Sequence, residues 1–221
     1  MKKIILFIKM VNFKSLFFNF KYLPFKKAIY LPILISKNCL LTKTKGVIII
    51  DAPIKTGMIK IGYAGVGIFD HNRSRSIWQV SGKVIFRGRA EIGHGSKISV
   101  NKGGCVEFGA NFSISAESKI ISNKHIKFGN DVLISWDCLI MDTDFHKILD
   151  KKNNIINPDK PIIIGDRVWI TCQNLILKGS IIGNDSIIGA KSKLSSDISN
   201  KSGLFSGAPI KFISEDAKFK K

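Results

Sequence analysis

The chain has no paired cysteines, no long uncharged apolar run and little arginine. Its four cysteines are far apart without a CxxC pair, which argues against a disulfide framework or a zinc site and favours thiols in a reducing cytoplasm. Only five of its 35 basic residues are arginine, and the basic residues are scattered, with no nucleic-acid-binding motif. We therefore expect no nucleic-acid partner, and we interpret the net charge of +19 as lysine-rich composition or as a general attraction for anions.

Lysines interrupt the apolar stretches of residues 1–24. The uncharged runs are too short to span a bilayer, and the run after Lys3 is shorter than the roughly 7 to 15 residues of a signal peptide. A basic amphipathic helix is predicted because apolar residues recur at helical spacing: Leu6, Met10, Phe13, Phe17 and Phe20. Such a helix either docks on the rest of the protein or on a neighbouring subunit, or it lies on the inner face of an anionic membrane.

A six-residue period is the most informative pattern in the sequence. Isoleucine or leucine recurs at every sixth position from Ile164 to Leu194, and small residues such as Ser186 and Ser192 lie four places after most of them. This period fits neither a helix nor a simple strand pair, but it fits a β-solenoid whose coils stack in parallel. Glycine often follows the apolar residue, as at Gly183 and Gly189, where a triangular coil must turn a corner. We predict an all-β solenoid.

The period also divides the chain. It can be followed back to Ile92 and, in degenerate form, to about Gly46. We predict a mostly helical cap over residues 1–45, the solenoid over 46–198, and a C-terminal turn and basic tail over 199–221. Between Ile140 and Ile164 the period stops, and this polar, lysine-rich segment is predicted to form an extruded loop over 141–163. Loops on rigid scaffolds are where chemistry is often found.

One of the four histidines, His146, lies in this loop, close to Asp142 and Asp144. An imidazole with an unperturbed pKa of about 6.5 can take a proton from a hydroxyl, and a neighbouring carboxylate can orient it. We predict that His146 is the catalytic base and that Asp142 or Asp144 orients it; the alternative is an exposed histidine among solvating aspartates. A solenoid carbonic anhydrase would need three converging histidines, two of them close in sequence, and no such pair is present, so no metal is expected.

The chain resembles the hexapeptide-repeat O-acetyltransferases, a group that includes galactoside, maltose and capsular-polysaccharide acetyltransferases. The resemblance covers about residues 85–213 and rests on three segments: Ile164–Ile170, Ile188–Ser192 and Gly207–Lys211. It implies a left-handed parallel β-helix, a homotrimer, and acetyl-coenzyme A as acyl donor, bound between adjacent subunits. His146 matches the catalytic histidine of the family.

The resemblance also implies the residues that contact the donor. Trp169 matches a tryptophan that lies against the pantetheine arm, although a packing role in the coil is the alternative. Thr171 stands where the family has glycine, and Cys172 stands where it has a small polar residue. Cys172 as a nucleophile is a minor alternative, because no histidine is near it in sequence. Further matched contacts are Ala190, Ser195 and Lys211.

These observations predict a cytoplasmic enzyme, free or peripheral at the inner face of the membrane, that acetylates a hydroxyl of a surface polysaccharide or its precursor. Transfer would be direct, without a metal or a covalent intermediate, and backbone amides of residues 169–172 would hold the oxyanion. Ser115 replaces an asparagine that touches the sugar in the galactoside enzymes, and Trp136 is either a platform for a sugar ring or a packing residue. One alternative is N-acetylation of a nucleotide amino sugar, although residues 1–45 are too few for the added nucleotide-binding domain that often precedes such enzymes. The other is an inactive scaffold, which would need neither His146 nor Trp169.

Overall fold

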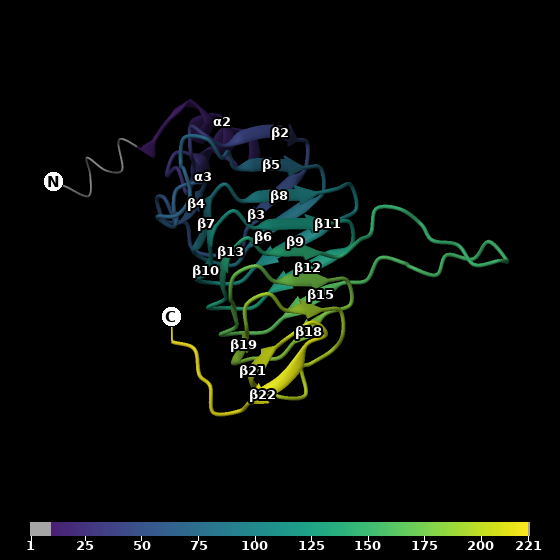
Figure 1. Cartoon of the computed structure of the whole chain (residues 1–221). Coiled ribbons are helices and arrows are strands. Elements are labelled where there is room, and N and C mark those ends of the chain that lie inside the picture. Colours follow the sequence, from purple (N-terminus) through teal and green to yellow (C-terminus); the bar gives the residue numbers. More distant parts are fainter. Residues whose placement is uncertain (1–9, 221) are drawn as a thin grey trace.

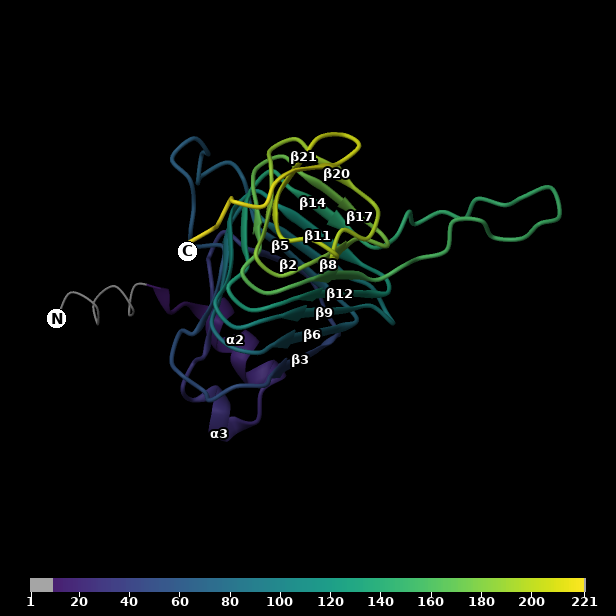
Figure 2. The ribbon, with the colours of Figure 1, turned by 90° about the horizontal axis from the view of Figure 1, so that it is seen from below.

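The structure is a computed structural model that describes residues 10–220. Two short helices, α2 (Phe13–Tyr22) and α3 (Phe25–Ala28), lie at one end of a stack of coils made of β-strands (Figure 1). Seen along the stack, the strands lie on the sides of a triangular coil, and one long loop projects away from it (Figure 2). The fold is a left-handed parallel β-helix, as predicted.

Within the described residues, the strands form three sheets, and up to β20 the strands that pair are three places apart in sequence order, because each coil contributes one strand to each sheet. At the C-terminal end, β21 pairs with β19 and β22 pairs with β21. Sheet A contains β1 (Ile33–Ile35), β4 (Ile59–Ile61), β7 (Ala90–His94), β10 (Phe112–Ala116), β13 (Leu133–Trp136), β16 (Trp169–Ile170), β19 (Ser186–Ile188), β21 (Gly203–Ser206) and the antiparallel β22 (Lys211–Ser214). Sheet B contains β2 (Leu40–Thr44), β5 (Ile77–Val80), β8 (Lys97–Val100), β11 (Lys119–Ser122), β14 (Leu139–Met141), β17 (Leu175–Leu177) and β20 (Lys193–Leu194). Sheet C contains β3 (Val47–Ile50), β6 (Lys83–Phe86), β9 (Cys105–Phe108), β12 (His125–Phe128), β15 (Ile162–Ile164) and β18 (Ile181–Ile182).

The core is a set of ladders in which equivalent residues of successive coils lie above one another. In sheet A, a continuous isoleucine ladder is formed because each residue pairs in register with the next, and all are buried: Ile92, Ile114, Ile134, Ile170 and Ile188. In sheet C, the rings of Phe86, Phe108 and Phe128 stack with centroids 5.2 and 5.6 Å apart. Each coil therefore buries its apolar side chains against its neighbours, and no coil has a core of its own.

Helix α2 covers the open edge of sheet A. The Asn19 side chain donates to the Ile33 carbonyl (2.6 Å) and accepts from its amide (3.1 Å), while the Ser15 hydroxyl accepts from the Ile35 amide (2.9 Å). These contacts satisfy backbone groups that an edge strand would otherwise leave unpaired. Phe18 packs edge-on against Trp78 in the core. The helix thus docks on the solenoid through Ser15, Phe18 and Asn19.

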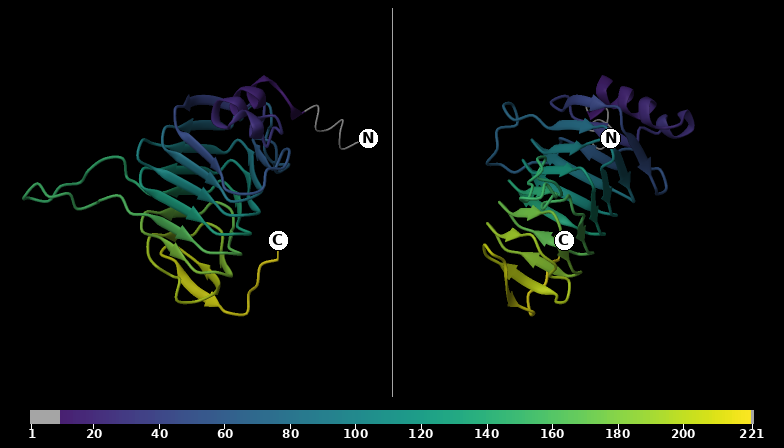
Figure 3. Two further views of the ribbon diagram at one scale, coloured as in Figure 1. Left: turned by 180° about the vertical axis from the view of Figure 1, so that it is seen from behind. Right: turned by 90° about the vertical axis from the view of Figure 1, so that its right-hand side faces the viewer.

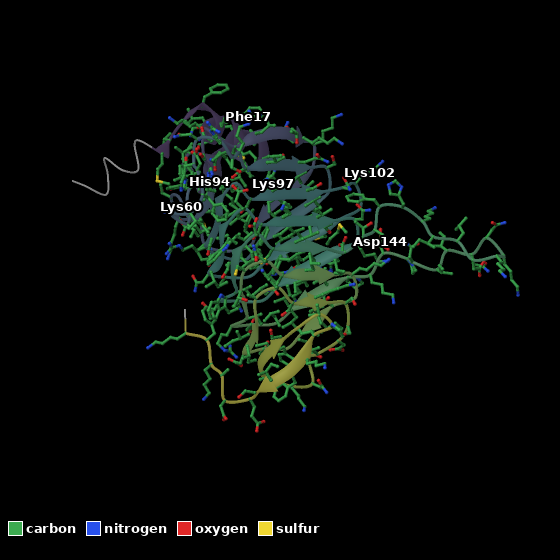
Figure 4. All side chains as sticks on the ribbon, in the orientation of Figure 1. Phe17, Lys60, His94, Lys97, Lys102 and Asp144 are labelled. Atoms are coloured by element: carbon green, nitrogen blue, oxygen red, sulfur yellow. The ribbon has the colours of Figure 1, made fainter. Side chains whose placement is uncertain are left out.

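The residues predicted to form the apolar stripe of this helix lie on a different side of it. Phe13, Phe17 and Phe20 are exposed, and Phe17 lies at the outer surface of the cap (Figure 4). Leu6 lies outside the described residues. None of the helices within residues 10–220 is both long enough and apolar enough to span a bilayer.

The coils extend further than predicted at both ends. Strands β1 and β2 lie within residues 1–45, so only part of that cap is helical, and β21 continues sheet A beyond residue 198. The period is hidden at the first coils because the segment between Ile61 and Ile77 inserts extra residues between β4 and β5. The predicted extruded loop is confirmed between β14 and β15, and it projects from one side of the stack (Figure 3).

Candidate functional site

The loop of residues 142–161 leaves the solenoid after β14 in sheet B and returns to β15 in sheet C. Its two arms are linked by an antiparallel bridge between Leu149 and Ile155, and Asp150 closes the turn at its tip by accepting amide hydrogen bonds from Lys152 and Asn154. The loop exposes an unusual number of apolar side chains: Phe145, Ile148, Leu149, Ile155 and Ile156. Exposed apolar groups on one segment are typical of a surface that contacts a partner.

A network of hydrogen bonds fixes the root of the loop around His146. The Asn157 amide group donates to the Asp144 carboxylate and to the His146 carbonyl, both at 2.9 Å. Lys178, at the end of β17, donates to the Asp144 carboxylate (2.5 Å) and to the Asn157 carbonyl (2.8 Å). Figure 4 shows Asp144 where the loop leaves the stack. Both arms of the loop are therefore tied to one another and to the next coil.

The hydrogen bond from Lys178, followed by that from Asn157, lowers the pKa of the Asp144 carboxyl. Asp144 is consequently ionised near neutral pH. Its carboxylate holds the loop rather than the imidazole, and it is the Asp144 carbonyl that accepts from the His146 amide, at 2.7 Å.

Asp142, the other predicted partner of the imidazole, has a structural position. It is buried, and its carboxylate accepts from the Ser122 hydroxyl (2.8 Å) and from the backbone amides of Asn123 (2.7 Å) and Lys124 (3.1 Å). These groups belong to the preceding coil, so Asp142 anchors the start of the loop there. Its adjacency to His146 in sequence suggested an imidazole partner, but the turn of the chain directs its carboxylate inward.

His146 itself is exposed, and no hydrogen bond or ion pair within residues 10–220 engages its ring. The orientation of the imidazole by Asp142 or Asp144 is therefore not found in the single chain. The two ring nitrogens are free to meet a ligand, while the backbone that carries them is fixed by Asn157.

A second group of predicted residues lies on sheet A. Trp169 is half-buried, and its indole N–H donates to the hydroxyl of buried Ser135 at 3.0 Å. The register that pairs Ile114 with Ile134 places Ser115 beside Ser135. In the C-terminal tail, the Phe219 ring lies 5.4 Å from the Trp169 ring.

The predicted donor contacts Cys172 and Ala190 lie in line with Trp136, the predicted sugar platform, at the corner between sheets A and B. The register that pairs Ile134, Ile170 and Ile188 continues to these three positions. The Thr171 amide and hydroxyl both donate to the Ile188 carbonyl, at 3.0 and 2.7 Å, so the amide of Thr171 is not available to an oxyanion. The amide of the half-buried Cys172 has no such partner among the described residues. Of the predicted oxyanion donors after Trp169, Cys172 is the one that remains open.

The other predicted donor contacts lie elsewhere. Ser195 is exposed directly after β20, the last strand of sheet B, and Lys211 is exposed at the start of β22, the second strand of the terminal hairpin. The His146 loop projects on the side of the stack away from the C-terminal tail that reaches Trp169 (Figure 2). A single chain thus brings His146 to one corner and Trp169 to another.

Sequence reasoning missed Asn157, Lys178 and Ser135. Each acts across a coil or across the loop, on residues far away in the sequence. The position of Lys178 directly after the apolar residues of β17 is a weak indication that it lies at the edge of a coil. The six-residue period does not predict that it pairs with Asp144.

Comparison with known proteins reveals relatives that share this architecture. WbbJ of Escherichia coli (strain K12), named as a lipopolysaccharide biosynthesis O-acetyl transferase, is 26% identical over 142 residues, which are 60% of this chain and 71% of the relative. Galactoside O-acetyltransferase of the same organism is 30% identical over 115 residues, which are 51% of this chain and 55% of the relative. The chain is thus similar in sequence to two proteins named as O-acetyltransferases.

The hexapeptide-repeat fold is also found in a solved structure, that of the polySia specific acetyltransferase NeuO. It matches with a TM-score of 0.53 and 24% sequence identity over 86% of this chain and 79% of that one, a likeness that concerns the fold. No protein-family model matches the chain.

Proposed function

We propose that the chain is an acetyl-CoA-dependent O-acetyltransferase that acts on a hydroxyl of a saccharide, either a surface polysaccharide or its precursor, with His146 as general base. The observation that carries the proposal is the state of His146: its imidazole is exposed and unengaged, while Asp144, Asn157 and Lys178 fix the loop backbone that bears it. A ring held in this way is ready to accept a proton from a bound hydroxyl. An inactive scaffold would not need this arrangement.

The active site is shared between copies of the chain in this proposal. His146 lies in the loop between sheets B and C, whereas Trp169 begins β16 of sheet A, so a second copy is needed to bring a Trp169 to a His146. The exposed apolar side chains of the loop, among them Phe145 and Ile156, supply a surface that such a neighbour would bury. A homotrimer, with the donor between adjacent subunits, satisfies both requirements.

The reaction is a direct transfer. His146 accepts the proton of the acceptor hydroxyl as its oxygen forms a bond to the thioester carbonyl, and the Cys172 amide donates to the oxyanion that develops. The carbon–sulfur bond then breaks, and His146 returns the proton to the sulfur, so that the products are the ester and the free thiol of coenzyme A. Trp169 faces outward to contact the donor, and Ala190, Ser195 and Lys211 are its remaining contacts.

The test is an acetyl-transfer assay with acetyl-CoA and a panel of oligosaccharides, polysaccharides and nucleotide amino sugars. We expect an alkali-labile ester on a sugar acceptor, together with stoichiometric release of free thiol. An alkali-stable amide would show that the enzyme is an N-acetyltransferase instead. A protein that bound no acetyl-CoA and transferred no acetyl group would be the inactive scaffold.

The N-terminal cap supports a peripheral position of this enzyme at the inner face of an anionic membrane. Phe13 and Phe25 are 80% and 70% exposed on the side of α2 and α3 that faces away from the solenoid core, and lysines such as Lys26 flank them. No aspartate or glutamate occurs before Asp51. Exposed aromatic side chains can enter the interface, and each lysine near an anionic surface contributes about 1 kcal/mol.

The membrane proposal is tested by sedimentation of the full chain with vesicles of phosphatidylcholine, with and without phosphatidylglycerol. We expect salt-sensitive binding to the anionic vesicles, and loss of most of it in the triple variant Phe13→Ser/Phe17→Ser/Phe20→Ser. The matched control, Phe212→Ser/Ile213→Ser, removes exposed apolar groups at the opposite end and should bind like the wild type. Equal binding by the triple variant, or a change in oligomeric state instead of vesicle binding, would reject the proposal.

A further inference from the structure

Three side chains with metal-binding atoms meet on the outer face of sheet C. Val106 and Phe108 of β9 point into the core, so Cys105 and Glu107 of the same strand point outward. His125 of β12 lies on the next coil and pairs in register with Cys105. The thiol, a carboxylate oxygen and a ring nitrogen all lie within 4.8 Å of one another. Two parallel strands of a rigid stack therefore hold all three donors in place.

We propose that Cys105, Glu107 and His125 bind one Zn²⁺ ion, which joins two adjacent coils of the solenoid. Zinc is bound in proteins by thiolate, imidazole and carboxylate ligands, usually in tetrahedral geometry. The His125 Nε2 and Glu107 Oε1 atoms are 2.9 Å apart, close to the separation of two ligands on one small cation. Three protein ligands leave the fourth position to water or to another ligand.

Arg87 prepares the carboxylate for this role. Its guanidinium donates to the Glu107 Oε2 atom at 2.7 and 3.1 Å, which leaves Oε1 directed at His125, and it also contacts Asp51 at 2.7 Å. Burial acts to raise the pKa of Glu107, but the hydrogen bonds from Arg87 and His125 outweigh it and lower that pKa. Glu107 is therefore ionised near neutral pH. Its orientation by a partner on the far oxygen is an arrangement common around metal sites.

Zinc binds the thiolate form of cysteine, so the Cys105 thiol gives up its proton when the ion enters the site. With the thiolate and the Glu107 carboxylate as ligands, the two negative charges balance the ion.

The site is independent of the acyltransfer proposal, although it lies near the active loop. Ile126, next to His125, pairs with Ile162, which begins the strand to which the loop returns. A zinc ion at His125 would stiffen the coil on which that return strand rests. Its effect on transfer would be indirect, since none of the three ligands belongs to the proposed catalytic set.

The test is a titration of the chelator-treated full chain with Zn²⁺, and with Co²⁺ as an optical probe. We expect one ion per chain, a thiolate-to-cobalt charge-transfer band, and affinity at least about tenfold weaker in Cys105→Ser and His125→Gln. The controls Cys172→Ser and His71→Gln remove a half-buried thiol and an exposed imidazole elsewhere and should bind zinc like the wild type. Circular dichroism checks that each variant folds. A folded wild type without saturable binding, or Cys105→Ser with unchanged affinity, would overturn the proposal.

Discussion

Replacing His146 with alanine is expected to lower the rate of acetyl transfer by about 10²- to 10⁴-fold, the usual contribution of a positioned general base. The imidazole is exposed and makes no hydrogen bond within residues 10–220, so its removal should cost almost nothing in folding. The Asn157 side chain donates to the backbone carbonyl of residue 146 and not to its ring, so the loop should keep its position in the variant. The measurement is kcat for acetyl transfer, together with the affinity for acetyl-CoA and the melting temperature.

The control for this experiment is His71→Ala, which removes an exposed histidine from the turn between β4 and β5. It should retain the wild-type rate. Full transfer activity in His146→Ala would exclude the catalytic role of His146 and leave the identity of the base open. A parallel loss of folding in that variant would instead mean that the ring has a packing role, contrary to its exposure.

The architecture could be predicted from the sequence because a solenoid repeats the same burial pattern in every coil. In the sheet A ladder, Ile170 and Ile188 are 18 residues apart, which is three steps of six, whereas the earlier steps of 22 and 20 residues contain short slips in the period. The loop is visible in the sequence because the period stops after Ile140. The second coil could not be predicted, because the inserted segment between Ile61 and Ile77 displaces β5 from the position that the period predicts. Periodicity identifies coils only where their lengths are equal.

The contacts of the site were harder to predict from the sequence, because they join residues that lie one coil apart. Asp142 meets Ser122 at a sequence separation of 20, but Asp144 meets Lys178 at a separation of 34, since the loop lies between them. The same separation of 20 brings Cys105 to His125. A search for closely spaced cysteines cannot find such a set, so the sequence argument against a zinc site addressed only ligands from one short segment.

Phe108→Ala should produce the largest loss of stability among single core substitutions considered for this chain, about 3–5 kcal/mol. The ring is fully buried and stacks between Phe86 and Phe128, and it also touches Phe112, whose ring centroid is 4.6 Å away. Alanine would leave a cavity inside a ladder of rigid coils that can collapse only slightly. Because stability in a solenoid comes from contacts between neighbouring coils, this cavity weakens two interfaces at once.

Chemical denaturation at equal protein concentration measures this effect, since the stability of an oligomer depends on concentration. Phe13→Ala is the matched control: the same side chain is removed from a position 80% exposed on α2, where the change should stay within about 0.5 kcal/mol. If both variants lost the same small amount, the phenylalanine ladder would not be a source of stability. The loop is held by Asp142, Asn157 and Lys178 and not by the aromatic core. Phe108→Ala should therefore lose stability but keep its transfer rate per folded molecule. That result would show that the stability of the stack and the position of the His146 loop depend on different contacts.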